Sequence, residues 1–211
     1  MTHILARAAR AVALVAFLLA LAGCERTLFE RSPAEAGCDP ALAGRWLSQD
    51  DNDEDEGELV ATIDAHCQLT TVEHKASGPR RSTPTTLRTG QADGVRYLWL
   101  DAAWANASFE VKPNALDHAG DVYLFAYRLR GDRLDLAPPP HRSVAHRVLD
   151  KDVPGEVLKQ DDELTVRITG ERDALRKTLR TYRIFRFDDA LRFRRAKAGE
   201  AGKQARSDGS P

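Results

Sequence analysis

Short runs of alternating apolar and polar residues, separated by turn residues, constrain the fold of this chain more than any other feature. The clearest example is the pair of runs 122–130 and 133–137, which flank Gly131-Asp132. A two-residue connection of this kind suits a tight turn between two antiparallel strands. The sequence therefore predicts a β-hairpin over residues 122–137.

Similar runs recur along the chain and indicate the fold class. They cover residues 42–48, 58–64, 66–75, 94–100, 163–169, 182–187 and 191–194. Two other segments, residues 141–149 and 171–180, have apolar side chains at helical spacing. We therefore predict a mainly β domain, a single antiparallel barrel or sandwich with two short helices. A closed barrel is the favoured form because it leaves no sheet edge exposed.

Aromatic residues gather on the predicted strands. They are Tyr97, Trp99, Trp104, Tyr123, Phe125, Tyr127, Tyr182, Phe185 and Phe187. In residues 122–128 the aromatic and aliphatic side chains alternate, so both faces are apolar, and we expect one to meet the barrel core and the other a helix. A barrel this small is expected to have a filled interior. A cavity lined by these aromatic residues is the alternative.

The first 23 residues have the organisation of a secretory signal peptide. Arg7 and Arg10 precede an apolar run over residues 11–22, and the sequence turns polar at Glu25. The run is 12 residues long, whereas a helix that spans a membrane needs about 20. We therefore predict that residues 1–23 are cleaved during export.

The end of that segment, Leu21-Ala22-Gly23-Cys24, resembles the lipobox of bacterial lipoproteins. The resemblance implies that the sulfur of Cys24 takes a diacylglycerol, that cleavage falls after Gly23, and that the new amine is acylated. It also implies the periplasmic face of the outer membrane, because Glu25 rather than aspartate follows the cysteine. Two or three acyl chains suffice for stable anchoring.

Composition divides the rest of the chain into three parts. Residues 24–37 are polar and small and predict a flexible tether. Residues 38–195 form the predicted β-rich domain, and residues 196–211, which lack any large apolar side chain, predict a disordered tail. Loss of Arg7 and Arg10 leaves 29 basic and 32 acidic residues, a net charge of −3 that is too even to favour a nucleic-acid partner.

Three cysteines fit an exported protein. If Cys24 carries lipid, Cys38 and Cys67 remain as a pair in a compartment where disulfides persist. Their bridge would close a loop of about 30 residues, and the lost loop entropy would stabilise the fold by roughly 3.5 kcal/mol. Two free buried thiols are the alternative, because spacing alone does not establish a disulfide.

A second resemblance concerns the fold. Gly44-Arg45-Trp46 on an early strand, together with a basic residue on the last strand at Arg192 or Arg194, resembles the small lipocalin-like barrels. The resemblance implies that the tryptophan closes one end of the barrel and that the late arginine packs across it. It also implies a carrier of lipids or small ligands.

Residues 50–58 are acidic at seven of nine positions and predict a solvated loop. No register of this segment has both the glycine and the glutamate that a calcium-binding EF-hand loop requires, although a weak divalent-cation site is an alternative. We instead expect the loop to attract a basic protein partner. The candidate partner-binding residues are Asp51, Asp53, Glu54, Asp55 and Glu56.

The sequence holds neither a nucleophile elbow, a glycine-rich phosphate loop nor histidines at zinc-ligand spacing. We therefore expect no catalytic residue, no metal and no cofactor. The expected function is that of a lipoprotein of the cell envelope, anchored in the membrane, with a non-enzymatic β-rich binding domain. Two alternatives are an inhibitor or immunity protein that binds a basic envelope enzyme, and a lipid or small-ligand carrier.

Overall fold

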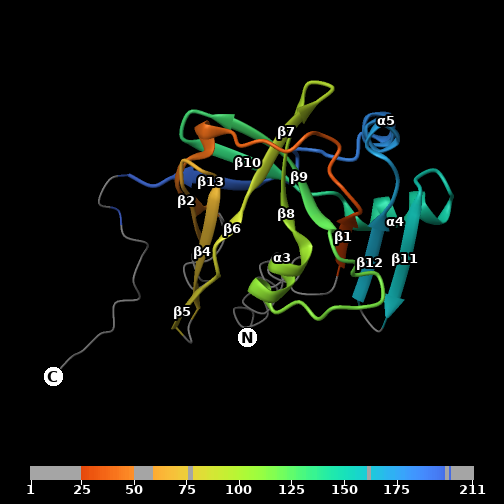
Figure 1. Ribbon diagram of the computed structural model, residues 1–211, viewed down its shortest axis with the longest axis horizontal. Coiled ribbons are helices and arrows are strands. Elements are labelled where there is room, and N and C mark those ends of the chain that lie inside the picture. The colour runs from red at the N-terminus through yellow and green to blue at the C-terminus, as the bar shows by residue number, and fades with distance from the viewer. Residues whose placement is uncertain (1–24, 50–58, 76–77, 161–162, 198–199, 201–211) are drawn as a thin grey trace, which may run out of the picture.

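The computed structural model of the protein describes residues 25–49, 59–75, 78–160, 163–197 and 200 (Figure 1). The elements in chain order are β1 Glu25–Phe29, the 3₁₀-helix η1 Pro40–Leu42, β2 Gly44–Ser48, β3 Leu59–Ile63, β4 Gln68–Lys75, β5 Gly78–Arg81, β6 Thr85–Thr86, β7 Arg88–Ala92, β8 Val95–Asp101, α3 Ala102–Phe109, β9 Val122–Arg130, β10 Arg133–Ala137, α4 His141–Leu149, β11 Gly155–Gln160, β12 Glu163–Ile168, α5 Arg172–Tyr182 and β13 Leu191–Arg195. The protein is mainly β, as predicted. Among the described residues, the helices are all too short or too polar to cross a membrane.

The strands form one mixed sheet. Its hydrogen-bonded path runs β11-β12-β1-β9-β10-β13-β2-β3-β4-β5, and β8 pairs with both β9 and β7. Strand β1 runs parallel to β12, and the predicted hairpin of β9 and β10 is confirmed. The path has two ends, at β11 and β5, so it is not the closed ring that a barrel requires. Leu87 alone separates β6, which pairs with β4, from β7, which pairs with β8.

Strand β9 divides the interior into two apolar clusters. Val122, Leu124 and Ala126 belong to a cluster that also contains buried side chains of α4 and α5. Tyr127 and the partly buried Phe125 belong to a second cluster, formed with β2, β3, β4, β10 and β13. The prediction that both faces of this strand are covered, one of them by helices, is confirmed. Figure 1 shows β2, β4 and β13 at one side and β11, β12, α4 and α5 at the other.

The structure differs from the tether predicted over residues 24–37, because strand β1 begins at Glu25. The side chains of residues 26–29 expose at most 2% of their surface. The polar ones have fixed partners: Arg26 binds Asp117, and the Thr27 hydroxyl lies 2.9 Å from Nδ1 of His141. The folded domain therefore starts earlier than the predicted boundary at residue 38.

Two further predictions need correction. Residues 182–187 do not continue as a strand, because α5 extends to Tyr182 and ends at Arg183, which adopts the left-handed conformation. In the predicted disordered tail, the described residues are in contact with the domain. The Ala196 amide donates to the Arg45 carbonyl at 2.8 Å, and Glu200 accepts two hydrogen bonds from Arg194.

Candidate functional site

The site residues predicted from the sequence fall into two groups. Six lie outside the described residues, namely Cys24, Asp51, Asp53, Glu54, Asp55 and Glu56. Cys38 and Cys67 form the predicted disulfide, with Cα atoms 5.8 Å apart. In the part of the chain that the structure describes, no group of histidine, cysteine, aspartate and glutamate side chains is placed to hold a metal ion.

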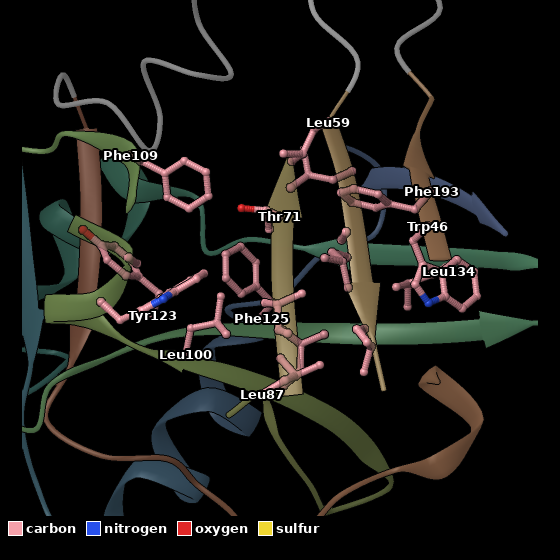
Figure 2. A pocket seen from close by; sticks show the side chains of 18 residues that line it. Trp46, Leu59, Thr71, Leu87, Leu100, Phe109, Tyr123, Phe125, Leu134 and Phe193 are labelled. Atoms are coloured by element: carbon pink, nitrogen blue, oxygen red, sulfur yellow. The ribbon is translucent and has the colours of Figure 1, made fainter. Parts of the chain in front are cut away.

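The described chain contains an apolar cavity of about 110 Å³ (Figure 2). Its lining residues are Trp46, Leu59, Ala61, Ile63, Leu69, Thr71, Leu87, Leu98, Leu100, Trp104, Ala105, Phe109, Tyr123, Phe125, Leu134, Leu136, Leu191 and Phe193. The surface that these side chains present to the cavity is entirely apolar. Among the described residues, this space favours the alternative to a filled interior, a cavity lined by aromatic residues. Of the aromatic residues considered from the sequence, Trp104, Tyr123 and Phe125 line the cavity.

Strand alternation explains why these side chains converge. In β3, Leu59, Ala61 and Ile63 point into the cavity, whereas Thr62 between them is exposed. The same period-2 pattern brings in two residues each from β10 and β13. Ala61 is the smallest side chain of the β3 row, so the middle of this wall leaves space unfilled.

The side chains that line the cavity differ in burial. Trp46, Ile63 and Leu87 expose at most 5%. Leu100 and Phe125, near Leu87 in Figure 2, are half-buried, and so are Leu59 and Phe109, which Figure 2 shows at the side opposite Leu87. We call the side at Leu59 and Phe109, to which helix α3 contributes Phe109, the mouth.

Trp46 forms part of the cavity wall, beside its ladder partner Ala61 in β3. Its indole N–H donates to the Leu42 carbonyl at 2.8 Å, and the guanidinium of Arg195 lies 4.3 Å from its ring centroid. The basic residue that packs on the tryptophan was predicted to be Arg192 or Arg194, and that prediction is wrong. Arg195 is directly opposite Trp46 in the ladder of β13 and β2, and Arg194 points to the other face because side chains alternate.

A buried polar cluster lies behind the cavity wall, where it joins β1 to α3. The Tyr123 hydroxyl donates to Oδ1 of Asn106 at 2.8 Å, and Asn106 donates to Asp117 at 3.2 Å. Arg26 donates to both carboxylate oxygens of Asp117, at 3.0 and 2.7 Å. We call these four residues the Arg26 cluster. Burial opposes the charge of Arg26, but the nearby Tyr123 and Asp117 raise its pKa above the ordinary value.

His141 is the histidine with the most perturbed acidity. It starts α4, and burial lowers its pKa to about 4, although the nearby Glu25 opposes the shift. The ring is therefore neutral at physiological pH, and its Nδ1 lies 2.9 Å from the Thr27 hydroxyl. This pair does not line the cavity. We assign it a structural role.

Sequence reasoning missed most of the cavity lining. The available signal was the alternation of apolar residues in β3, β10 and β13, which marks their inward faces but not whether those faces meet. An apolar lining of this kind suits binding of an apolar group. Comparison of the chain with protein-family models, curated proteins and solved structures finds no match.

Proposed function

We propose that this protein is a lipid-anchored protein of the bacterial cell envelope whose non-enzymatic β domain binds an apolar group in its cavity. The observation that carries the proposal is the wholly apolar lining of a cavity that has buried Trp46 in its wall and half-buried Leu59 and Phe109 at its mouth. Such a lining favours a hydrocarbon ligand, because each methylene transferred from water contributes about 0.8 kcal/mol.

The size of the cavity limits the ligand. Engineered apolar cavities of about 150 Å³ hold benzene, so a volume of about 110 Å³ suits a similarly small group. The end of an alkyl chain fits this volume, and a whole fatty acid does not. The domain is therefore proposed to bind the end of a chain and to leave the rest of the ligand at the mouth.

A lipocalin-like barrel is the finer fold proposal. Two observations support it: the packing of Arg195 on Trp46, and the segment from β6 to β7, which pairs with β4 at one end and with β8 at the other. The Leu87 amide between these two strands donates to the Cys67 carbonyl at 2.8 Å. This segment lies where a closed wall around the cavity needs a strand.

The envelope location rests on two features. Leu21-Ala22-Gly23-Cys24 resembles a lipobox, and the disulfide between Cys38 and Cys67 suits an oxidising compartment. We propose the periplasmic face of the outer membrane. Labelled palmitate should be incorporated into the wild-type protein and not into Cys24→Ser. Label in the serine variant, or a wild type without label, would contradict the anchor.

Ligand binding is tested with octanol brominated at its methyl end, because bromine quenches tryptophan fluorescence at short range. The Cys24→Ser chain from residue 24 onward should show saturable quenching as the chain end approaches Trp46. Ala61→Phe fills the cavity and should weaken binding by about tenfold or more, a loss of at least 1.4 kcal/mol. Thr62→Phe, at the exposed position between Ala61 and Ile63, is the matched control and should bind normally.

If quenching is linear rather than saturable in the wild type, the cavity does not bind alkyl chains. Ala61→Phe needs a folded domain to be informative, so its circular dichroism is compared with that of the wild type. Thr71→Leu also fills the cavity, from β4, and should weaken binding in the same direction. Normal binding by both folded variants would place the ligand elsewhere.

A further inference from the structure

We propose that the mouth of the cavity faces the membrane surface and receives the end of an acyl chain from a lipid that stays in the bilayer. The inference rests on the proposed function, since it uses both the lipid anchor at Cys24 and the apolar cavity. It adds an interaction surface, the mouth around α3, and a partner, the hydrocarbon of membrane phospholipid.

The proposed lipid anchor at Cys24 and the folded domain are adjacent in the chain. Strand β1 begins at Glu25, the residue that follows Cys24, and its first ladder partner is Leu164 in β12. Consecutive Cα atoms are about 3.8 Å apart, so an acylated Cys24 holds this end of β1 at the membrane surface. The orientation of the domain on the membrane is then set by where β1 begins.

Strand β1 begins close to the mouth of the cavity. Arg26, the second residue of the strand, lies 3.5 Å from the Asn106 side chain of α3. The neighbouring residue Ala105 and Phe109, one turn further on, both line the cavity. Since Phe109 lies at the mouth, the anchored end of β1 and the mouth are on the same side of the domain.

The start of β1 is held rigidly against the cavity wall. Arg26 exposes 2% of its surface and holds Asp117 through two hydrogen bonds, and its Nε donates to Thr165 of β12 at 3.1 Å. Tyr123, which lines the cavity, belongs to the same cluster through Asn106. The anchored strand and the cavity wall therefore move as one body.

The side chains at the mouth suit a membrane interface. Leu59 and Phe109 are half-buried apolar residues. Glu110 and Lys112 after Phe109 are exposed, and the acidic residues 50–58 precede Leu59 in the sequence. Trp104 is half-buried and donates its indole N–H to the Thr83 carbonyl at 2.9 Å. Tryptophan is enriched where hydrocarbon meets the headgroups, because its ring is apolar and its N–H is polar.

The size of the cavity fits a chain end supplied from a bilayer. A volume of about 110 Å³ holds only the end of an acyl chain. Extraction of a whole lipid would leave most of its chains in water, at a cost of about 0.8 kcal/mol for each exposed CH₂. A mouth held at the membrane avoids that cost because the remainder of the lipid stays in the bilayer.

The test uses the full lipidated protein in phosphatidylcholine vesicles whose lipid is brominated near the methyl end of one chain. Zwitterionic lipid is chosen because the seven carboxylates of residues 50–58 disfavour an anionic surface. Bromine carried into the cavity should quench Trp46, and Ala61→Phe should abolish that part of the quenching. Vesicles brominated near the headgroup should quench Trp46 less.

A variant with a longer linker tests the orientation of the domain on the membrane separately from binding in the cavity. A flexible insert of about 15 glycine and serine residues between Cys24 and Glu25 spans about 20 Å and frees the domain to turn. Cavity quenching should then fall about threefold or more, as the effective concentration of chain ends at the mouth falls. The same insert appended after Pro211 is the matched control and should leave quenching unchanged.

The outcomes distinguish the two proposals. If the Cys24→Ser chain fails to bind brominated octanol in solution, the proposed function fails and this inference fails with it. If that binding is normal but the linker inserted between Cys24 and Glu25 leaves vesicle quenching unchanged, only the proposed orientation on the membrane is wrong. If lipidated protein in lipid-free detergent already excludes brominated octanol while Cys24→Ser binds it, the protein's own anchor occupies the cavity, which also overturns the inference.

Discussion

The guanidinium of Arg195 lies over the ring of Trp46, 4.3 Å from its centroid, and links β13 to β2 beside the cavity. Arg195 also donates to the carbonyls of Ala41 and Ala43. The contact explains Gly44 in the Gly-X-Trp pattern. This glycine has φ +141°, and a Cβ at its position would collide with the Arg195 guanidinium.

Gly44→Ala should therefore lower the free energy of unfolding by about 1–3 kcal/mol, through backbone strain and displacement of Arg195. Arg195→Met should cost about 1–2 kcal/mol through lost cation–π contact and hydrogen bonds. Urea unfolding checks both. Arg130→Met, at the exposed end of β9, is the control and should change stability by no more than about 0.5 kcal/mol. Equal effects at positions 130 and 195 would contradict the role of Arg195.

The second prediction concerns the Arg26 cluster. Asp117→Asn leaves the guanidinium of Arg26 buried without its counter-charge, and we expect a loss of about 3 kcal/mol in unfolding free energy. Replacing both partners, Arg26→Met with Asp117→Leu, should recover much of that loss because no charge remains buried.

The surface pair of Arg186 and Asp188 is the matched control for this measurement. Both side chains are more than two-thirds exposed. Arg186→Gln should therefore change the free energy of unfolding by less than about 1 kcal/mol. A loss in Asp117→Asn that is no larger than this would show that the buried pair contributes little.

The third prediction concerns pH. Burial lowers the pKa of His141 to about 4 in the folded protein, whereas an unfolded histidine titrates near 6.5. The unfolded state binds more protons between these values, so stability is complete above about pH 6.5 and falls as pH drops towards 4. The loss attributable to His141 approaches about 3 kcal/mol. Urea unfolding from pH 4 to 7 should show a shallower decline in His141→Gln, and parallel curves would contradict the assignment.

The fourth prediction concerns the disulfide. The double variant Cys38→Ala with Cys67→Ala should lose roughly 3.5 kcal/mol, because its unfolded chain regains the entropy of a loop of about 30 residues. Reducing agent should lower the stability of the wild type by a similar amount and leave the double variant unchanged. A reductant effect on the double variant would show that the loss has another source.

The fold could be predicted from the sequence where the signal is local. Alternation and a two-residue turn identified the hairpin of β9 and β10, and helical spacing identified α4 and α5. Strand β1 could not be found this way, because its polar residues are satisfied by distant partners. Arg26 and Asp117 are 91 residues apart, and Thr27 and His141 are 114 residues apart.

The candidate site was harder to predict than the fold. The inward face of each strand follows from alternation, but an empty space depends on the sum of side chains from seven strands, α3 and Leu87. The Arg195 contact illustrates the limit of sequence reasoning. The last strand was recognised, and the choice between Arg192, Arg194 and Arg195 depended on knowing that Phe193 points inward.

The most direct test of the proposed binding is a calorimetric titration of the Cys24→Ser chain with straight-chain alcohols of increasing length. Affinity should rise about fourfold for each added methylene while the chain fills the cavity, and should level off once the chain reaches the mouth at Leu59 and Phe109. Ala61→Phe should remove the rise. Absence of saturable binding, or the same rise in Ala61→Phe, would contradict the assignment of the cavity as the binding site.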